Sequence, residues 1–345
     1  MVLPHVVPAI APQPGGVDWP TRAWPTGPAP AGIDALVDAA FSDPAMATTY
    51  AVVIVQGGLL VAERYGNALP SFTHAPTPVT AATPLLSWSM AKSVLHSAVG
   101  LLVADGVVDL DRPIGAPEWP DGDARAAITW RQCLQMRDGL AWREDYVDDT
   151  ASDVIEMLFG AGKDDVAHFA AERELEAAPG TRFSYSSGTS NLLARAVGEA
   201  VGGGEAIARR LRDRLFAPIG MTEATIGLDA AGTFVGSSFA YATARSWARF
   251  ATLYLRGGEW DGRRVLDRDW VDTAQVPTGA DDDGTYYSHH WWLDAKGTYW
   301  ASGYRGQRAI VVPALDAVVV RLGDTPQEGY DALAGWCASV IDALR

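Results

Sequence analysis

Cysteine is scarce in this sequence. Its 345 residues include two cysteines, Cys133 and Cys337, which are far apart and form no C-x-x-C pair. This spacing argues against a disulfide framework and suits a reducing compartment. Cys337 lies on the apolar face of a predicted terminal helix, so we expect it to be a buried free thiol.

Long apolar runs and a secretory leader are also missing. No run reaches the roughly twenty residues that a membrane-spanning helix needs. Residues 1–30 have neither the basic start nor the apolar segment of a signal peptide. The sequence therefore predicts a soluble, cytoplasmic protein that does not act at a membrane.

Positive charge is in deficit. Lysine and arginine number 27 against 42 acidic residues, which gives a net charge of -15 at pH 7. A nucleic-acid binder needs a basic face, so this class is excluded. The sequence has no motif for metal binding, nucleotide binding or a nucleophile elbow. His289 and His290 are neighbours, so on a strand their side chains would point to opposite faces, which is poor spacing for a metal site. We expect no metal, no cofactor and a small-molecule substrate; the oligomeric state stays open.

The most informative stretch is the apolar run of residues 84–103. It predicts a buried helix with Ser87 as its N-cap and Asp105-Gly106 as its end. Ser89 and Lys92 are three residues apart, so they share a face near the helix N-terminus. A desolvated lysine there can accept the proton of the serine hydroxyl, and the helix N-terminus favours negative charge on a substrate oxygen.

A chance match is the alternative, because S-x-x-K is a short motif. In that interpretation Lys92 is a solvated surface lysine beside an incidental serine. The surrounding pattern is apolar, however, and a buried lysine needs a partner or a chemical role. The only other lysines are Lys163 and Lys296.

Strand patterns occupy both ends of the chain and helical patterns its middle. Two β-rich runs joined by Gly57-Gly58 predict a hairpin over 50–65, and a second hairpin is predicted over 307–322. A final helix follows at about 328–344. The fold class is therefore α/β (α+β), a central antiparallel sheet flanked by helices plus a mostly helical domain. The predicted divisions are a proline-rich arm at 1–31, a sheet domain at 32–115 and 237–345, and a helical domain at 116–236.

Acyl transfer by a serine needs two further groups. Tyr185 precedes a predicted helix and could pass a proton to the leaving group, although core packing is the commoner role of a lone tyrosine. The oxyanion needs two N–H donors, for which Ser89 and Gln307 are the candidates. Gly303 and Gly306 beside Gln307 permit a close backbone approach, or else only shape a turn.

In this order, Ser89-x-x-Lys92, Tyr185-Ser-Ser and Tyr304-Arg-Gly-Gln resemble the serine β-lactamase and penicillin-binding superfamily. The nearest branch is the class C β-lactamase-like hydrolases, with the type VIII carboxylesterases and the 6-aminohexanoate-dimer hydrolases. The likeness covers most of the chain, including residues 86–93 and 135–146. It implies a β-lactamase/transpeptidase-like fold with the site between the two domains.

The resemblance also implies roles for single residues. Ser89 becomes the acylated nucleophile, Lys92 its general-base partner and Tyr185 the proton shuttle. The backbone N–H groups of Ser89 and Gln307 become the oxyanion hole. Tyr146 matches a tyrosine that lies over the substrate amide in the nylon-oligomer hydrolases; a packed loop aromatic is the alternative.

Two positions depart from the family pattern. Ser187 stands where the tyrosine motif often has asparagine, and Tyr304-Arg305-Gly306 stands where β-lactamases have Lys-Thr-Gly. That lysine helps to hold the substrate carboxylate, so strong β-lactamase activity is not expected. Arg305 and Arg308 are both candidates to replace its charge. Substrate contacts are assigned to Tyr146, Ser187, Tyr304, Arg305 and Gly306.

We therefore predict a serine hydrolase that cleaves small carboxylic esters or short linear amides through an acyl-enzyme. Esters are favoured, because their leaving groups ask less of the acid. The alternatives are a β-lactamase or D-alanyl-D-alanine peptidase-like activity and a non-catalytic binding protein on the same fold.

Overall fold

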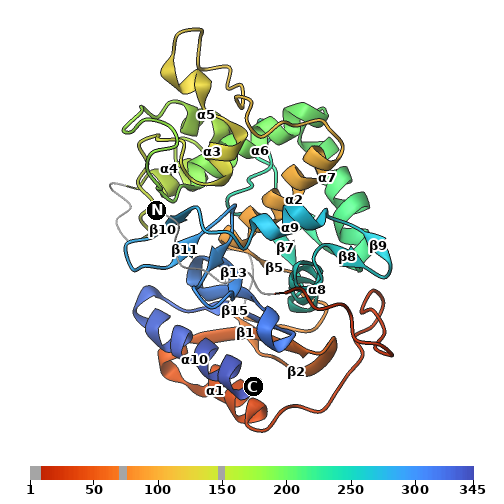
Figure 1. The fold of residues 1–345 in the computed structure, drawn as a ribbon. Helices are drawn as coiled ribbons and strands as arrows, with labels where there is room; N and C mark the ends of the chain where they lie inside the picture. Colours follow the sequence, from red (N-terminus) through yellow and green to blue (C-terminus); the bar gives the residue numbers. More distant parts are fainter. Residues whose placement is uncertain (1–8, 70–75, 147–151) are drawn as a thin grey trace.

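An eight-stranded antiparallel sheet is the largest unit of the computed structural model, which describes residues 9–69, 76–146 and 152–345 (Figure 1). Its strands, in spatial order, are β10 (Gly279–Ala280), β11 (Tyr286–Tyr287), β12 (Trp292–Leu293), β13 (Tyr299–Gly303), β14 (Gln307–Val312), β15 (Ala317–Asp324), β1 (Thr48–Gln56) and β2 (Leu59–Tyr65). The α/β fold class expected from the sequence is confirmed, and so are both predicted hairpins.

The sheet joins the two ends of the chain. β1 and β15 lie side by side with Val53 opposite Val320. Side chains alternate along a strand, so β1 contributes to two cores. Val53 and Val55 face one core, while Val52 and Ile54 face the other. Both faces of this strand are buried, which explains its continuous apolar run.

Helices cover both faces of the sheet (Figure 1). The helices are α1 (Ile33–Ser42), α2 (Ala91–Ala104), α3 (Trp130–Leu134), α4 (Asp153–Phe159), α5 (Val166–Ala171), α6 (Ser187–Val201), α7 (Gly204–Leu211), α8 (Ala244–Leu255), α9 (Arg268–Thr273) and α10 (Tyr330–Ala343). α1 and α10 cover one face, and α2 and α8 belong to the core on the other. The division into two domains stays a prediction.

The run of residues 84–103 is not one helix. It contains a short strand, β5 (Leu85–Leu86), then a 3-10 turn over Trp88–Met90, and only then α2. β5 pairs with β7 (Ala240–Ala242), which also pairs with β6 (Thr225–Ile226). Ser87 occupies the N-cap position of the 3-10 turn and not that of α2, and its side chain does not cap the turn: the hydroxyl donates to the Trp88 carbonyl, 2.8 Å away.

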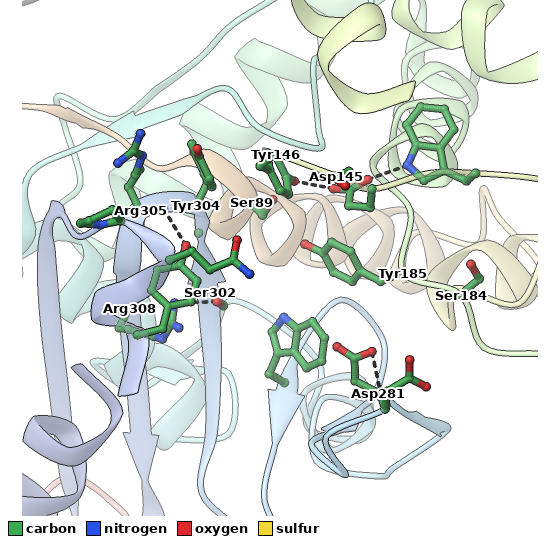
Figure 2. Close-up of a pocket in the computed structure, with 18 of the residues that line it drawn as sticks. Ser89, Asp145, Tyr146, Ser184, Tyr185, Asp281, Ser302, Tyr304, Arg305 and Arg308 are labelled. Atoms are coloured by element: carbon green, nitrogen blue, oxygen red, sulfur yellow. Dashed lines mark hydrogen bonds between the residues drawn. The ribbon is translucent and has the colours of Figure 1, made fainter. Parts of the chain in front are cut away.

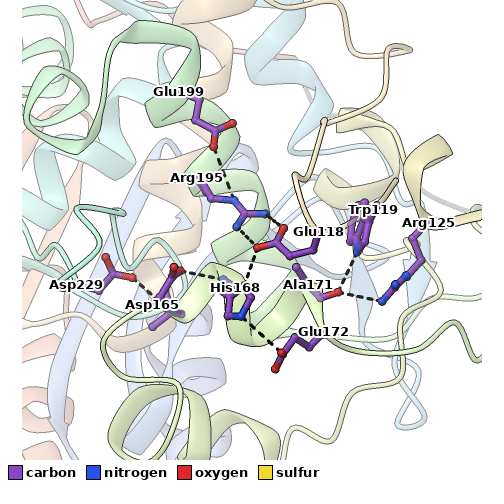
Figure 3. Close-up of polar contacts among 11 residues, drawn as sticks. Glu118, Trp119, Arg125, Asp165, His168, Ala171, Glu172, Arg195, Glu199 and Asp229 are labelled. Carbon is purple, nitrogen blue, oxygen red and sulfur yellow. Dashed lines mark hydrogen bonds and ion pairs between the residues drawn. The ribbon is translucent and has the colours of Figure 1, made fainter. Parts of the chain in front are cut away.

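A polar network holds the segment before α3 against α5 and α6 (Figure 3). Glu118 accepts two hydrogen bonds of 2.8 Å from Arg195 of α6 and one of 2.9 Å from His168 of α5. Nearby, the Trp119 indole and the Arg125 guanidinium both donate to the last carbonyl of α5. In the ranges that the structure describes, no helix is long and apolar enough to cross a membrane.

Candidate active site

Ser89 and Lys92 meet where the 3-10 turn passes into α2. The Lys92 amine lies 3.1 Å from the Ser89 hydroxyl oxygen. Trp88, directly before the serine, has a φ of 48°. This left-handed conformation is costly for a bulky residue, and such strain is concentrated at functional sites. The turn therefore presents Ser89 at the surface of a cleft, while Lys92 is 2% exposed.

Three oxygen atoms surround the Lys92 amine. Besides Ser89, these are the Ser187 hydroxyl at 3.0 Å and the Ser237 carbonyl at 3.0 Å. Burial lowers the pKa of Lys92 to about 8, against a smaller opposing effect of the Glu144 carboxylate. Desolvation disfavours the ammonium form, so a useful fraction of the amine is neutral near pH 7.

Tyr185 lies beside the same amine. It stands just before Ser186, whose side chain caps α6, so the start of this helix positions both Tyr185 and Ser187. The Lys92 nitrogen is 4.8 Å from the centre of the Tyr185 ring. Burial, together with the field of Glu144, raises the pKa of Tyr185 well above its usual value. The phenol is therefore neutral and can donate a proton.

These side chains open into a cleft of about 1000 Å³ (Figure 2). One side is aromatic: Tyr146 stacks on Tyr304 at 4.6 Å, and Trp88 meets Tyr304 edge-on at 5.5 Å. On the other side Trp292 lies against Tyr185. Tyr146 and Tyr304 thus line the cleft, as does Arg305. No group of three or more potential ligands in the described ranges could hold a metal ion.

Gln307, Gly306 and Ser187 do not line this cleft. The Gln307 side chain is buried in the sheet, where its amide bonds both backbone groups of Gly323 at 2.7 and 2.9 Å. A Cβ at Gly306 would meet Leu333, behind the strand. Ser187 is fully buried against Lys92. The substrate contacts expected of Gly306 and Ser187 are therefore not supported by their positions.

The end of β13 comes closest to the serine turn. A Cβ at Gly303 would clash with the carbonyl oxygen of Ser87, so only glycine allows this approach. Tyr304 follows directly and lines the cleft, whereas Gln307 lies opposite Gly303 on β14. The backbone N–H of Tyr304, next to this approach, is therefore an alternative to that of Gln307 as the second oxyanion donor.

The two arginines differ in their partners. Arg305 forms an ion pair with Asp324 at 3.3 Å and lies over the Tyr304 ring. Arg308 donates to the Ser302 hydroxyl at 2.7 Å and to the Gln307 carbonyl, and no carboxylate of the described residues pairs with it. Both line the cleft, and burial lowers the pKa of Arg308 from its usual value. Of the two arginines, Arg308 is thus the one whose charge is not paired with a carboxylate of the described residues.

Glu144 is the site residue to which the sequence analysis gave no role. One carboxylate oxygen accepts from the Ser187 hydroxyl at 2.6 Å and from the Tyr146 hydroxyl. The other accepts from the Ser187 N–H at 2.9 Å and from the Trp142 indole at 2.5 Å. The spacing of Trp142, Glu144 and Tyr146 by two residues was the available signal, since such residues share a side of an extended chain.

The fold and this cluster define a class of protein. A buried serine–lysine pair at a helix start, a tyrosine beside it and an adjacent antiparallel sheet are what the resemblance to the β-lactamase superfamily implied. Residues 33–336 match the family model described as Beta-lactamase. The chain belongs to this family of serine hydrolases.

Individual relatives fit this assignment. The 6-aminohexanoate-dimer hydrolase of Paenarthrobacter ureafaciens is 28% identical over 303 residues, which are 81% of this chain and 73% of that protein. A Bacillus anthracis structure provisionally named a 6-aminohexanoate-dimer hydrolase aligns with a TM-score of 0.74 at 19% identity, over 98% of this chain and 90% of that one. A family VIII carboxylesterase aligns with a TM-score of 0.66 at 14% identity, over 91% and 99%. The two structural likenesses show the fold alone.

Proposed function

We propose that this protein hydrolyses small carboxylic esters or short linear amides through an acyl-enzyme on Ser89. One observation carries the proposal: the Lys92 amine lies 3.1 Å from the Ser89 hydroxyl, in a buried position that lowers its pKa to about 8. An amine that is partly neutral at working pH can serve as a general base, and the serine is a nucleophile only when a base takes its proton.

The remaining residues supply the other steps. Lys92 takes the proton of Ser89 as its oxygen attacks the carbonyl carbon of the substrate. The N–H groups of Ser89 and Tyr304 stabilise the oxyanion, with Tyr304 in the role expected of Gln307. Tyr185 protonates the leaving group, and Lys92 replaces the proton of the phenol. Water then attacks the acyl-enzyme by the reverse sequence and releases the acid.

The cleft supports a substrate with an apolar acyl part. Tyr146, Tyr304 and Trp292 provide flat aromatic walls close to the nucleophile. We favour esters, because their leaving groups need less help from an acid. The Paenarthrobacter relative is named a 6-aminohexanoate-dimer hydrolase, and an amide joins two such units, which supports short amides as the second substrate class.

The test compares Ser89→Ala with Ser184→Ala, a second serine of the same cleft. Hydrolysis of a short p-nitrophenyl ester should fall roughly 10⁴-fold or more for Ser89→Ala and stay near the parent rate for Ser184→Ala. Intact-mass spectrometry after brief incubation should find one acyl group on the parent and none on Ser89→Ala. Parent-like hydrolysis by Ser89→Ala would refute the proposal.

A β-lactamase or D-alanyl peptidase-like activity is the second candidate. The observation that favours it is the Arg308 guanidinium, which lines the cleft and could hold the carboxylate of such substrates. Stable labelling of Ser89 by a fluorescent penicillin would support this activity. Rapid acylation by esters without penicillin labelling would exclude it.

A further inference from the structure

The Glu144 carboxylate is held in one orientation by four donors. Each of its oxygens accepts two hydrogen bonds, which come from the Ser187 hydroxyl, the Ser187 N–H, the Tyr146 hydroxyl and the Trp142 indole. A carboxylate oxygen has two lone-pair sites, so both oxygens are saturated. Glu144 therefore cannot accept a further hydrogen bond, and each of its partners must donate a hydrogen to it.

The polarity of the Ser187 hydroxyl follows from this arrangement. A serine hydroxyl has one hydrogen, and here that hydrogen points at Glu144, 2.6 Å away. Towards Lys92, at 3.0 Å, the same oxygen can only accept. The Ser237 carbonyl, also at 3.0 Å from the amine, can never donate. Two of the three neighbours of Lys92 are thus acceptors only.

A neutral lysine amine has two hydrogens and one lone pair. If the hydrogens go to Ser187 and Ser237, the lone pair is left for the third neighbour, the Ser89 hydroxyl at 3.1 Å. We propose that Glu144 is a positioning residue which, through the Ser187 hydroxyl, directs the lone pair of Lys92 at the proton of Ser89. The inference rests on the proposed function, because it assigns Lys92 as the base.

The charge of Glu144 acts on the same amine. It favours the ammonium form of Lys92 and opposes the larger effect of burial. The other titratable groups around Lys92 are Tyr185, whose pKa is raised, and His290, whose pKa burial lowers to about 3. Both are uncharged at neutral pH, so removing the charge of Glu144 should lower the pKa of Lys92 further.

The experiment compares Glu144→Gln, Ser187→Ala and the double variant, with Glu205→Gln as a control at an exposed glutamate outside the cleft. The readout is the pH profile of kcat/KM for a short ester. The concentration of active sites in each variant is measured by titration with a fluorophosphonate, and rates are given per active site. Glu144→Gln should lower the plateau by about 10- to 100-fold, less than the 10²–10⁴ that a general base contributes. It should also move the acid limb to lower pH.

The other variants separate orientation from charge. Ser187→Ala keeps the charge of Glu144, so its plateau should fall with a smaller movement of the acid limb. The double variant should be little worse than the more damaged single variant, because both changes break one chain of bonds. Glu205→Gln should retain the parent profile.

Two results would overturn the inference. The first is a Glu144→Gln enzyme with the parent plateau and profile. The second is a Glu144→Gln enzyme in which fewer active sites react with the fluorophosphonate while the pH profile per active site is unchanged. This result would mark Glu144 as a purely structural residue. In both results the parent still acylates Ser89, so the proposed function survives. Absence of acylation in the parent would instead refute the proposed function, and this inference with it.

Discussion

Replacing Lys92 with methionine tests whether the amine is desolvated in the folded protein. Burial lowers the pKa of Lys92 from 10.5 to about 8. The folded state thus binds this proton less tightly than the unfolded chain, which destabilises the fold. The cost is complete below about pH 8, shrinks as the pH rises and vanishes above about 10.5. The linkage relation gives about 3 kcal/mol at pH 7 and about 1 kcal/mol at pH 9.5.

Methionine has a similar length but leaves two acceptors, Ser187 and Ser237, without their donor. This loss costs about 1–3 kcal/mol for each buried group, and it does not depend on pH over this range. The sign of the stability change at one pH is therefore uninformative. The informative quantity is its change between pH 7 and pH 9.5, which should be about 2 kcal/mol in favour of the parent protein.

Urea denaturation of both proteins at the two pH values measures this quantity. Lys163→Met, at an exposed lysine, is the matched control and should give the same difference from the parent at both pH values. A constant difference for Lys92→Met would mean that burial does not displace the proton of Lys92. The neutral fraction of the amine at neutral pH would then be negligible, and the proposed base would not exist.

Three further predictions follow from single contacts. Tyr185→Phe removes the proton donor, so hydrolysis of alkyl esters should fall by about 10²-fold or more, while p-nitrophenyl esters should be affected far less in parallel rate assays. Arg308→Met should raise KM about tenfold for esters that carry a carboxylate, the effect of losing about 1.4 kcal/mol of binding, and should leave KM for neutral esters unchanged. Burial acts to raise the pKa of Glu118, but its bonds to Arg195 and His168 lower it to about 2. Glu118→Gln should therefore be less stable than the parent protein above about pH 4.5, and this difference should disappear towards pH 2. Thermal melts of both proteins at each pH measure the difference.

The sheet could be predicted because its signals are local. A glycine pair between two β-rich runs selects a hairpin whatever the rest of the chain does, and β1 and β2 follow that pattern. Helix α8 was missed although Thr243 caps it and Trp247, Phe250 and Tyr254 recur at helical spacing.

The start of α2, the helix that carries Lys92, could not be predicted from composition. Residues 84–103 are apolar throughout because strand, turn and helix are all buried there, and an apolar run does not distinguish them. The turn depends on a left-handed φ at Trp88, a residue that gives no sign of it. The placement of Gln307 could not be predicted for a related reason. Its position opposite Gly303 is set by strand register, which needs the partner strand.

Ser187, which stands where the family pattern often has asparagine, and the Glu144 carboxylate depend on each other. A side chain at position 187 must accept from Lys92 and donate to Glu144, and a hydroxyl does both, as the amide of an asparagine would. The shorter serine needs its acceptor close by. Gly188 provides that proximity: a Cβ there would clash with the Trp142 ring, which packs on the start of α6 and donates to Glu144. The small residues at 187 and 188 therefore admit the carboxylate, and the carboxylate in turn gives the hydroxyl its direction.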